Sequence, residues 1–178
     1  MIALSGTPTL RTERLVLRAP EAGDWPAFRD FLHSDRARFI RTGEMTPALA
    51  WRSFGHFVGH WVMRGFGSFV YHRAGDPAPL GATGPWFPEG WPEREIGWTV
   101  WSLEAEGHGF AAEAARAAIA HAFRDLGWDT AVSYVDPENH RSVALAERLG
   151  ARRDPEAPSA PAFEGALVFR HPRPEEAA

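Results

Sequence analysis

A strand-like run, a two-glycine turn and a long alanine-rich helix follow one another in this chain, and this succession most restricts its fold. Residues 93–101 are rich in β-branched and aromatic side chains, and residues 107–114 read Gly-His-Gly-Phe-Ala-Ala-Glu-Ala. A turn of this kind points several free backbone N–H groups, and the positive end of the helix dipole, at one place. That place suits a diphosphate, such as the pyrophosphate of a nucleotide-like cofactor.

The length and composition of the chain are those of one globular domain. It has 178 residues, of which 44% are hydrophobic, with 8 Trp and 12 Phe. We expect a single domain over residues 1–178, with flexible ends at about 1–8 and 172–178. No apolar stretch approaches the roughly 20 residues that a bilayer crossing needs, and the first residues lack the features of a signal peptide. The expected location is therefore the cytoplasm, with no membrane partner.

Missing residue types exclude several kinds of chemistry. The chain has no Cys and no Lys, and all 19 of its basic residues are Arg. A cysteine nucleophile, thiolate metal ligands, Schiff-base chemistry and a P-loop lysine are therefore excluded. The net charge of −4 argues against nucleic-acid binding. His56 and His60 are four residues apart on an expected helix but have no third ligand nearby, so we expect no metal site.

Hydrophobic periodicity and turn residues predict the helices and strands. The helix expected at 46–65 begins with Thr-Pro and ends at a glycine. Its expected buried face is made of Trp51, Phe54, Val58, Trp61 and Val62. The expected strands are 14–19, 66–72, 80–84, 94–101, 130–135 and 163–169, and the other expected helices are 24–32, 109–126 and 139–149. The three successive strands after the helix at 46–65 indicate an antiparallel meander.

Four segments, in order, resemble the GNAT superfamily of acyl-CoA-dependent N-acyltransferases, and most of all its RimJ/RimL-like branch. Residues 12–18 are similar to the opening strand of that branch, and residues 95–98 to the strand before its cofactor loop. Residues 107–114 are similar to the cofactor turn, and residues 139–150 to the next helix. The resemblance implies a mixed α/β (α+β) fold. In it, a mostly antiparallel central sheet opens into a V, is flanked by helices and holds acyl-CoA in its cleft.

The same resemblance implies which residues bind the acyl donor, acetyl-CoA. The pantetheine arm would run along the splayed end of the strand that carries Trp98, Thr99 and Val100. Asn139 would contact the pantetheine, and Ser142 would lie near the thioester sulfur. The backbone that would bind the pyrophosphate belongs to Gly107, His108, Gly109, Phe110, Ala111 and Ala112.

The expected reaction is direct attack of a neutral primary amine on the thioester, which needs a base and a proton donor. Glu95 is the expected base, because burial at the start of its strand would raise the pKa of its carboxyl group. Ser142 is the expected donor to the leaving thiolate. Two features depart from the family. Ala146 stands where many relatives have a Tyr general acid, and Glu104 and Glu106 place acid beside the expected pyrophosphate site.

The amine acceptor stays open between a protein N-terminus and a small molecule. Glu89, Glu93 and Glu95 near the expected cleft favour a cationic acceptor. Residues 25–65 and 86–92 are expected to shape its pocket. The family also implies that a homodimer is possible.

Other interpretations stay open as well. The missing Tyr and the acidic loop also suit a non-catalytic acyl-CoA-binding or regulatory module of the same fold. Gly107, Gly109 and Ala112, followed by Asp129, also satisfy the dinucleotide fingerprint of an oxidoreductase. The turn could equally open a helix without holding any ligand. At single positions, Glu95 could be paired with an Arg, and Asn139 could be only a helix cap.

Overall fold

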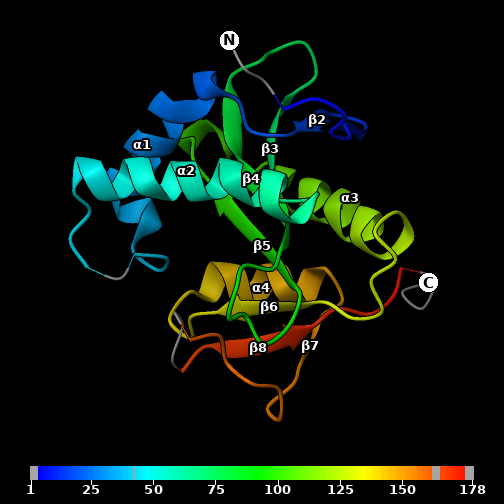
Figure 1. Cartoon of the computed structure of the whole chain (residues 1–178). Helices are drawn as coiled ribbons and strands as arrows, with labels where there is room; N and C mark the ends of the chain where they lie inside the picture. Colours follow the sequence, from blue (N-terminus) through cyan, green and yellow to red (C-terminus); the bar gives the residue numbers. More distant parts are fainter. Residues whose placement is uncertain (1–3, 42, 162–164, 175–178) are drawn as a thin grey trace.

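The computed structural model describes residues 4–41, 43–161 and 165–174, which form one sheet with helices around it (Figure 1). The strands are β1 Leu10–Arg11, β2 Leu15–Arg18, β3 Phe69–Arg73, β4 Pro79–Trp86, β5 Glu95–Val100, β6 Val132–Val135, β7 Arg152–Arg153 and β8 Leu167–Arg170. The α-helices are α1 Trp25–His33, α2 Pro47–Arg64, α3 Phe110–Arg124 and α4 His140–Arg148. Short 3-10 helices are η1 Ala22–Asp24, η2 Asp35–Ala37 and η3 Leu103–Ala105. The expectations for 1–3, 163–164 and 175–178 lie outside the described residues.

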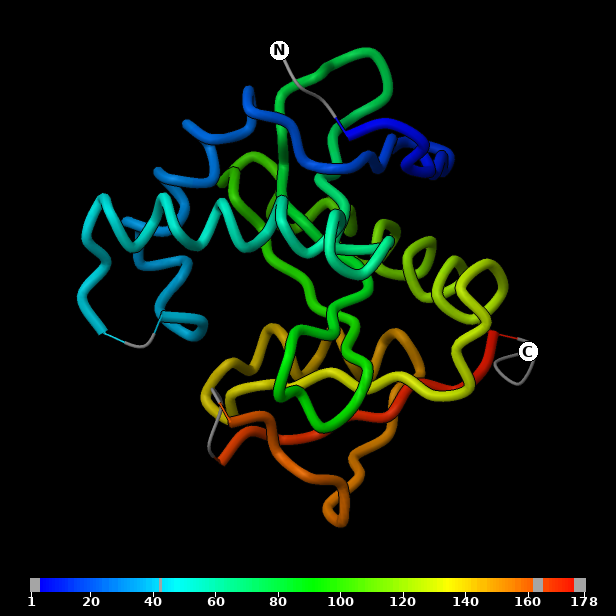
Figure 2. Tube along the Cα trace, viewed as in Figure 1, coloured from blue at the N-terminus to red at the C-terminus, as the bar shows by residue number. Residues whose placement is uncertain are grey.

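The sheet is mostly antiparallel and opens between β5 and β6. Over the described residues its strand order is β1-β2-β3-β4-β5-β6-β8-β7, so the expected meander from β3 to β5 is confirmed, and β2 extends it. β5 pairs with β4 along its whole length, but it pairs with β6, in parallel, only at Glu95↔Val132. Beyond that pair the two halves separate, and Figures 1 and 2 show β6 and β8 running in a different direction from β3 to β5. This is the expected V.

Buried polar groups hold the sheet together where the V begins. The Ser133 hydroxyl of β6 donates to the Ile96 carbonyl of β5 at 2.6 Å and accepts from Nε2 of His171 at 2.8 Å. Burial lowers the pKa of His171 to about 4, so its ring is neutral at physiological pH. These bonds fix the point from which the strands diverge.

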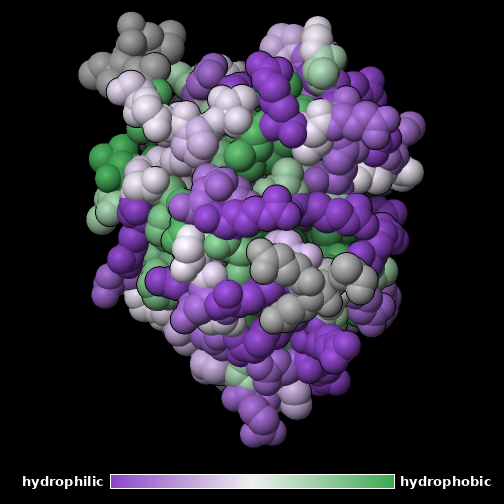
Figure 3. All heavy atoms as spheres, turned by 90° about the vertical axis from the view of Figure 1, so that its right-hand side faces the viewer, coloured by the Kyte–Doolittle hydropathy of each residue, from purple (hydrophilic) through white to green (hydrophobic). Residues whose placement is uncertain are grey.

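Alternation along the strands builds a core on each face of the meander. In β3, Val70 packs with side chains of α1 and α2, whereas Phe69 and Tyr71 pack with Phe110 of α3. α1 and α2 therefore cover one face and α3 covers the other. On the side of the molecule toward which α3 extends, the visible surface is mostly hydrophilic (Figure 3). No helix among the described residues has the length and apolar character to cross a bilayer.

Local signals place the ends of α2 correctly, but its expected buried face is partly wrong. Thr46 caps the helix by accepting from the Leu49 amide, and Gly65 ends it in the left-handed conformation at φ 75°. Trp51 is 60% exposed and Val62 is 70% exposed. The buried side chains are Ala50, Phe54, Phe57, His60 and Trp61. The helix is thus rotated from the expected orientation, because it packs against both α1 and the sheet.

The C-terminal part of the sheet was only partly expected. β7 was not predicted, and β8 lies between β6 and β7. A dinucleotide-binding unit needs parallel βαβ crossovers. Here the strands leading to the turn are antiparallel, and η3 separates β5 from it. The oxidoreductase interpretation is therefore wrong.

Candidate active site

The two-glycine turn before α3 is exposed and has free amide groups. Gly107 and Gly109 adopt φ angles of 75° and 76°, in the left-handed region that favours glycine. The first helical bond runs from the Glu113 amide to the Gly109 carbonyl at 3.0 Å. The amides of residues 107–112 have no hydrogen-bond acceptor among the described residues. This arrangement can receive an anion at the helix N-terminus.

Arg14, which the sequence did not predict as a site residue, lies beside this turn. Its Nη1 donates to the His108 carbonyl at 3.1 Å, its Nε donates to Glu113 at 2.7 Å, and its guanidinium lies 4.7 Å from the Phe110 ring centroid. The Thr12 hydroxyl also donates to Glu113. Burial acts to raise the pKa of Glu113, but these hydrogen bonds outweigh it, so the pKa is lowered. Residues of the opening segment thus attach α3 to β2 and place a cation next to the turn.

A groove of about 670 Å³ lies between β5 and α4, where the sheet opens. Trp98, Thr99 and Val100 line one side, and Asn139 and Ser142 line the other. The structure therefore brings together the residues that the sequence associated with pantetheine.

The edge of β5 that faces the groove carries backbone groups that β4 does not use. Val132 of β6 donates to the Arg94 carbonyl, so the backbone groups of Trp98 and Val100 point to the same side, away from β4. The Val100 carbonyl accepts from Nε of Arg36 at 3.2 Å. The amide and carbonyl of Trp98 and the amide of Val100 remain available to a linear ligand that carries amides.

Ser142 is held at the junction of the groove and a second cavity. Its amide donates to Oδ1 of Asn139 at 3.2 Å, so Asn139 is a helix cap, and its hydroxyl accepts from Nε1 of Trp98 at 3.2 Å. Because the Ser142 oxygen acts as acceptor in the second bond, its own proton stays free to be donated.

Glu106, the acidic departure in the cofactor loop, is balanced by two cations. Nη2 of Arg36 lies 2.7 Å from its carboxylate, and Nη1 of Arg141 lies 3.0 Å from the same oxygen. Arg38 also lines the groove, whereas Glu104 is exposed in η3. Asp35 and Glu138 also line the groove, so its arginines offset the charge of its acidic residues, Glu106 included.

Glu95 is buried and is not part of a salt bridge among the described residues. Oε2 accepts from Nε1 of Trp91 at 2.7 Å, while the neighbouring Arg94 pairs with Asp129. Burial raises the pKa of Glu95 to about 7, against the opposing effect of the Trp91 hydrogen bond. The interpretation of Glu95 as an Arg-paired carboxylate is therefore wrong.

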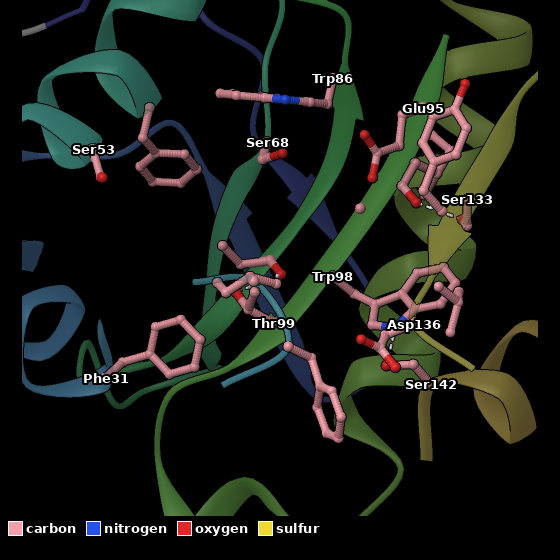
Figure 4. A pocket seen from close by; sticks show the side chains of 18 of the residues that line it. Phe31, Ser53, Ser68, Trp86, Glu95, Trp98, Thr99, Ser133, Asp136 and Ser142 are labelled. Carbon is pink, nitrogen blue, oxygen red and sulfur yellow. Dashed lines mark hydrogen bonds between the residues drawn. The ribbon is translucent and has the colours of Figure 1, made fainter. Parts of the chain in front are cut away.

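Glu95 and Ser142 line the same cavity, of about 380 Å³, which lies between α1, α2 and the diverging strands (Figure 4). Trp98, Thr99, Asn139 and Ser142 line both this cavity and the groove, so the two spaces meet at these residues. A ligand in the groove and a second molecule in the cavity would therefore meet near Ser142.

Tyr134 of β6 also lines this cavity, and the sequence analysis missed it. Burial, together with the charges of Glu93 and Glu95, raises its pKa to about 12, so the phenol keeps its proton. Ser133, Tyr134 and Val135 all line the cavity, so alternation along β6 gave no signal for Tyr134. Ala146, where the family pattern has a Tyr, is fully buried in α4.

His60 of α2 has structural contacts. Nδ1 of His60 bonds to the Phe66 carbonyl, Nε2 accepts from the Phe87 amide, and the ring stacks on Trp86 at 4.3 Å. Within the described ranges no cluster of three or more His, Cys, Asp or Glu side chains could hold a metal ion. His108 is exposed in the turn.

Comparison with known proteins gives consistent matches. The family model described as "Acetyltransferase (GNAT) domain" matches residues 14–152. The crystal structure of an acetyltransferase from Agrobacterium tumefaciens str. C58 is 37% identical with a TM-score of 0.85, and the match covers 97% of this chain and 98% of that one. A putative GnaT-family acetyltransferase from Bordetella pertussis is 27% identical with a TM-score of 0.74, over 93% and 99% of the two chains.

A more distant structure shares the fold alone. The spermidine N-acetyltransferase from Vibrio cholerae, solved in complex with CoA and spermine, is 17% identical with a TM-score of 0.67. That match covers 89% of this chain and 94% of the Vibrio protein.

Proposed function

Since this chain belongs to the GNAT family of acetyltransferases, we propose that it moves the acetyl group of acetyl-CoA to a primary amine by direct attack. The observation that carries the proposal is the shared cavity of Glu95 and Ser142, which meets the groove beside β5. In this proposal Glu95 is the base and Ser142 the proton donor for the reaction between donor and acceptor. The complex of the Vibrio spermidine acetyltransferase with CoA and spermine supports both ligand classes.

In this proposal the turn and the groove bind acetyl-CoA. The pyrophosphate is held by the amides of residues 107–112 and by the N-terminal end of α3. Pantetheine lies along Trp98, Thr99 and Val100 and is bounded by Asn139 on the far side. The glycines matter for their φ angles, because a Cβ on Gly107 meets nothing within 4 Å and one on Gly109 meets only Arg14, at 3.7 Å.

The proposed reaction uses two side chains for proton transfer. The amine nitrogen forms a bond to the acyl carbon, and the C–S bond breaks. Glu95 takes the proton that the neutral nitrogen loses, directly or through water, and Ser142 gives a proton to the thiolate sulfur. Water then carries the proton from Glu95 to the Ser142 oxygen, which restores both groups. The acceptor becomes an amide and the donor leaves as a free thiol. The chain has no Cys, so no acyl-cysteine step is available.

The test measures binding and turnover separately. We expect acetyl-CoA to bind in calorimetry, and a panel of amines to release free thiol in a colorimetric assay. Glu95→Gln and Ser142→Ala should each lower kcat by about 100- to 10,000-fold, whereas the exposed Glu89→Gln serves as a matched control. Rates within about threefold of the parent for both site variants would contradict the assigned roles.

A second candidate function is that of a non-catalytic acyl-CoA-binding module. It is favoured by the buried Ala146, which stands where the family pattern has a Tyr general acid. A family member that lacks the Tyr general acid could bind the acyl donor without turning it over. Such a module would bind acetyl-CoA in calorimetry and release no thiol with any amine of the panel.

We also propose membership of the RimJ/RimL-like branch on the basis of residues 12–18. Thr12 and Arg14 of this segment bond to Glu113 and so hold the helix that follows the turn. This proposal concerns the ancestry of the chain. It does not identify the amine acceptor, which depends on the residues that line the cavity. Arg14→Ala should weaken acetyl-CoA binding, and an unchanged Kd would leave the segment with a purely structural role.

A further inference from the structure

We infer that the acceptor is a small amine that carries a single positive charge and an apolar body. This inference rests on the proposed function and narrows its acceptor. Two observations carry it: most of the acidic groups near the cleft are already paired elsewhere, and the wall facing Glu95 is aromatic.

The charges near the cleft do not form a polycation site. Glu89 is fully exposed and lies 3.2 Å from Arg64. Both oxygens of Glu93 accept from Arg170, at 2.7 and 2.9 Å. Among the described residues, this leaves Glu95 and Asp136 as the carboxylates that line the cavity. The acidic sequence around residues 89–95 is therefore not evidence for an acceptor with several charges.

The two lining carboxylates lie on the strand side of the cavity, Glu95 at the start of β5 and Asp136 after the end of β6. In Figure 4, Asp136 lies beside Ser142, and Glu95 is on the neighbouring strand across Trp98. One Asp136 oxygen already accepts from the Glu138 amide at 2.8 Å. The ammonium that reacts is the one that reaches Glu95, to which it loses its proton.

Among the described residues, the rest of the cavity wall has no carboxylate that could pair with a second ammonium group of the acceptor. Its apolar side chains include Phe28, Phe31, Phe39, Met45, Phe57 and Trp86, and its polar side chains include Ser53, His56, Ser68 and Tyr134, none of which is a carboxylate. Phe28 and Phe57 stack at 5.6 Å, so their ring faces are partly occupied by each other. A second ammonium there would lose its water without gaining a carboxylate, which costs several kcal/mol in general. An alkyl or aryl group gains from burial against the same surface.

The experiment compares amines that differ by one charge. Hexylamine and 1,6-diaminohexane have the same chain length, so their kcat/KM ratio, measured by thiol release, isolates the cost of the second ammonium. We expect hexylamine and 2-phenylethylamine to exceed the diamine by at least about tenfold. A diamine or a short peptide used as well as hexylamine would overturn the inference while leaving acetyl transfer intact. No thiol release with any amine, despite acetyl-CoA binding, would reject both.

A variant tests the same idea from the side of the protein. Ser53 of α2 is half-buried and lines the wall opposite Glu95 (Figure 4). Ser53→Asp adds the missing carboxylate, and Ser53→Asn is its isosteric neutral control. We expect only Ser53→Asp to raise the diamine-to-hexylamine ratio, by about fivefold or more. An equal ratio in the two variants would show that charge in the wall does not select the acceptor.

Discussion

Nε1 of Trp91 donates a 2.7 Å hydrogen bond to Oε2 of Glu95, and both residues belong to the hairpin end that joins β4 to β5. This bond opposes the effect of burial, which raises the pKa of Glu95 to about 7. The indole thus keeps the pKa of this buried carboxylate close to neutral pH, so the carboxylate can accept a proton near pH 7.

Activity should depend on the ionisation of Glu95. The base must be deprotonated, so kcat/KM should rise with pH through a limb near pH 7. Trp91→Phe keeps a ring but removes the donor that lowers the pKa, and should therefore move this limb to higher pH. The measurement is kcat/KM from pH 5.5 to about 9 for both proteins. A limb at the same pH in both would show that the indole does not tune the titrating group.

The same carboxylate should reduce stability at high pH. Glu95 titrates at about 7 in the folded protein and near the ordinary value of 4.5 when unfolded. Between these values the folded state binds more protons, so the free energy of unfolding falls as pH rises. Glu95→Gln should therefore stabilise the protein at pH 8, relative to its effect at pH 4, by on the order of 3 kcal/mol.

Urea denaturation of the Glu95→Gln protein and of the parent at the two pH values measures this difference. Glu89→Gln, at a fully exposed position, is the control and should show no comparable dependence on pH. An equal effect of Glu95→Gln at pH 4 and pH 8 would show that Glu95 is not protonated in the folded state.

Ser142 should act on turnover more than on binding. Its hydroxyl accepts from Trp98 and keeps its proton for donation. Ser142→Ala should lower kcat by about 100- to 10,000-fold, while the Kd for acetyl-CoA, from calorimetry, stays within a few-fold. Ser53→Ala removes another hydroxyl of the same cavity and is the matched control. A loss of affinity without a loss of kcat would assign Ser142 to binding alone.

Gly109 should be needed for its backbone conformation. Its φ of 76° is strained for any residue with a Cβ, so Gly109→Ala should cost about 1–2 kcal/mol of stability. The shifted amides should also weaken acetyl-CoA binding. Gly55→Ala, inside α2 with open space around a Cβ, should instead stabilise by about 0.5–1 kcal/mol. Thermal unfolding with and without acetyl-CoA measures both effects.

Much of the local structure could be predicted because its signals lie within a few residues. Thr46 and Gly65 delimit α2, and Asn139 caps α4. Gly107 and Gly109 shape the turn before α3. Each of these depends on a side chain bonding to a nearby amide, or on the φ freedom of glycine. Such preferences need no knowledge of the rest of the chain.

Other features required the complete fold. The exposed Trp51 and the buried Phe57 depend on how α2 lies against α1 and the sheet. Glu93 looked like a cleft carboxylate, yet its partner is Arg170, which is 77 residues away.

The sequence by itself determined the local conformations: the glycine turn, the helix caps and the alternating strands of the meander. The tertiary structure alone decided which charges are neutralised, that Trp91 reaches Glu95, and that Tyr134 faces the cavity. The physical reason is distance along the chain. Backbone preferences act between neighbours, whereas ion pairing, desolvation and packing depend on residues that only the folded path brings together.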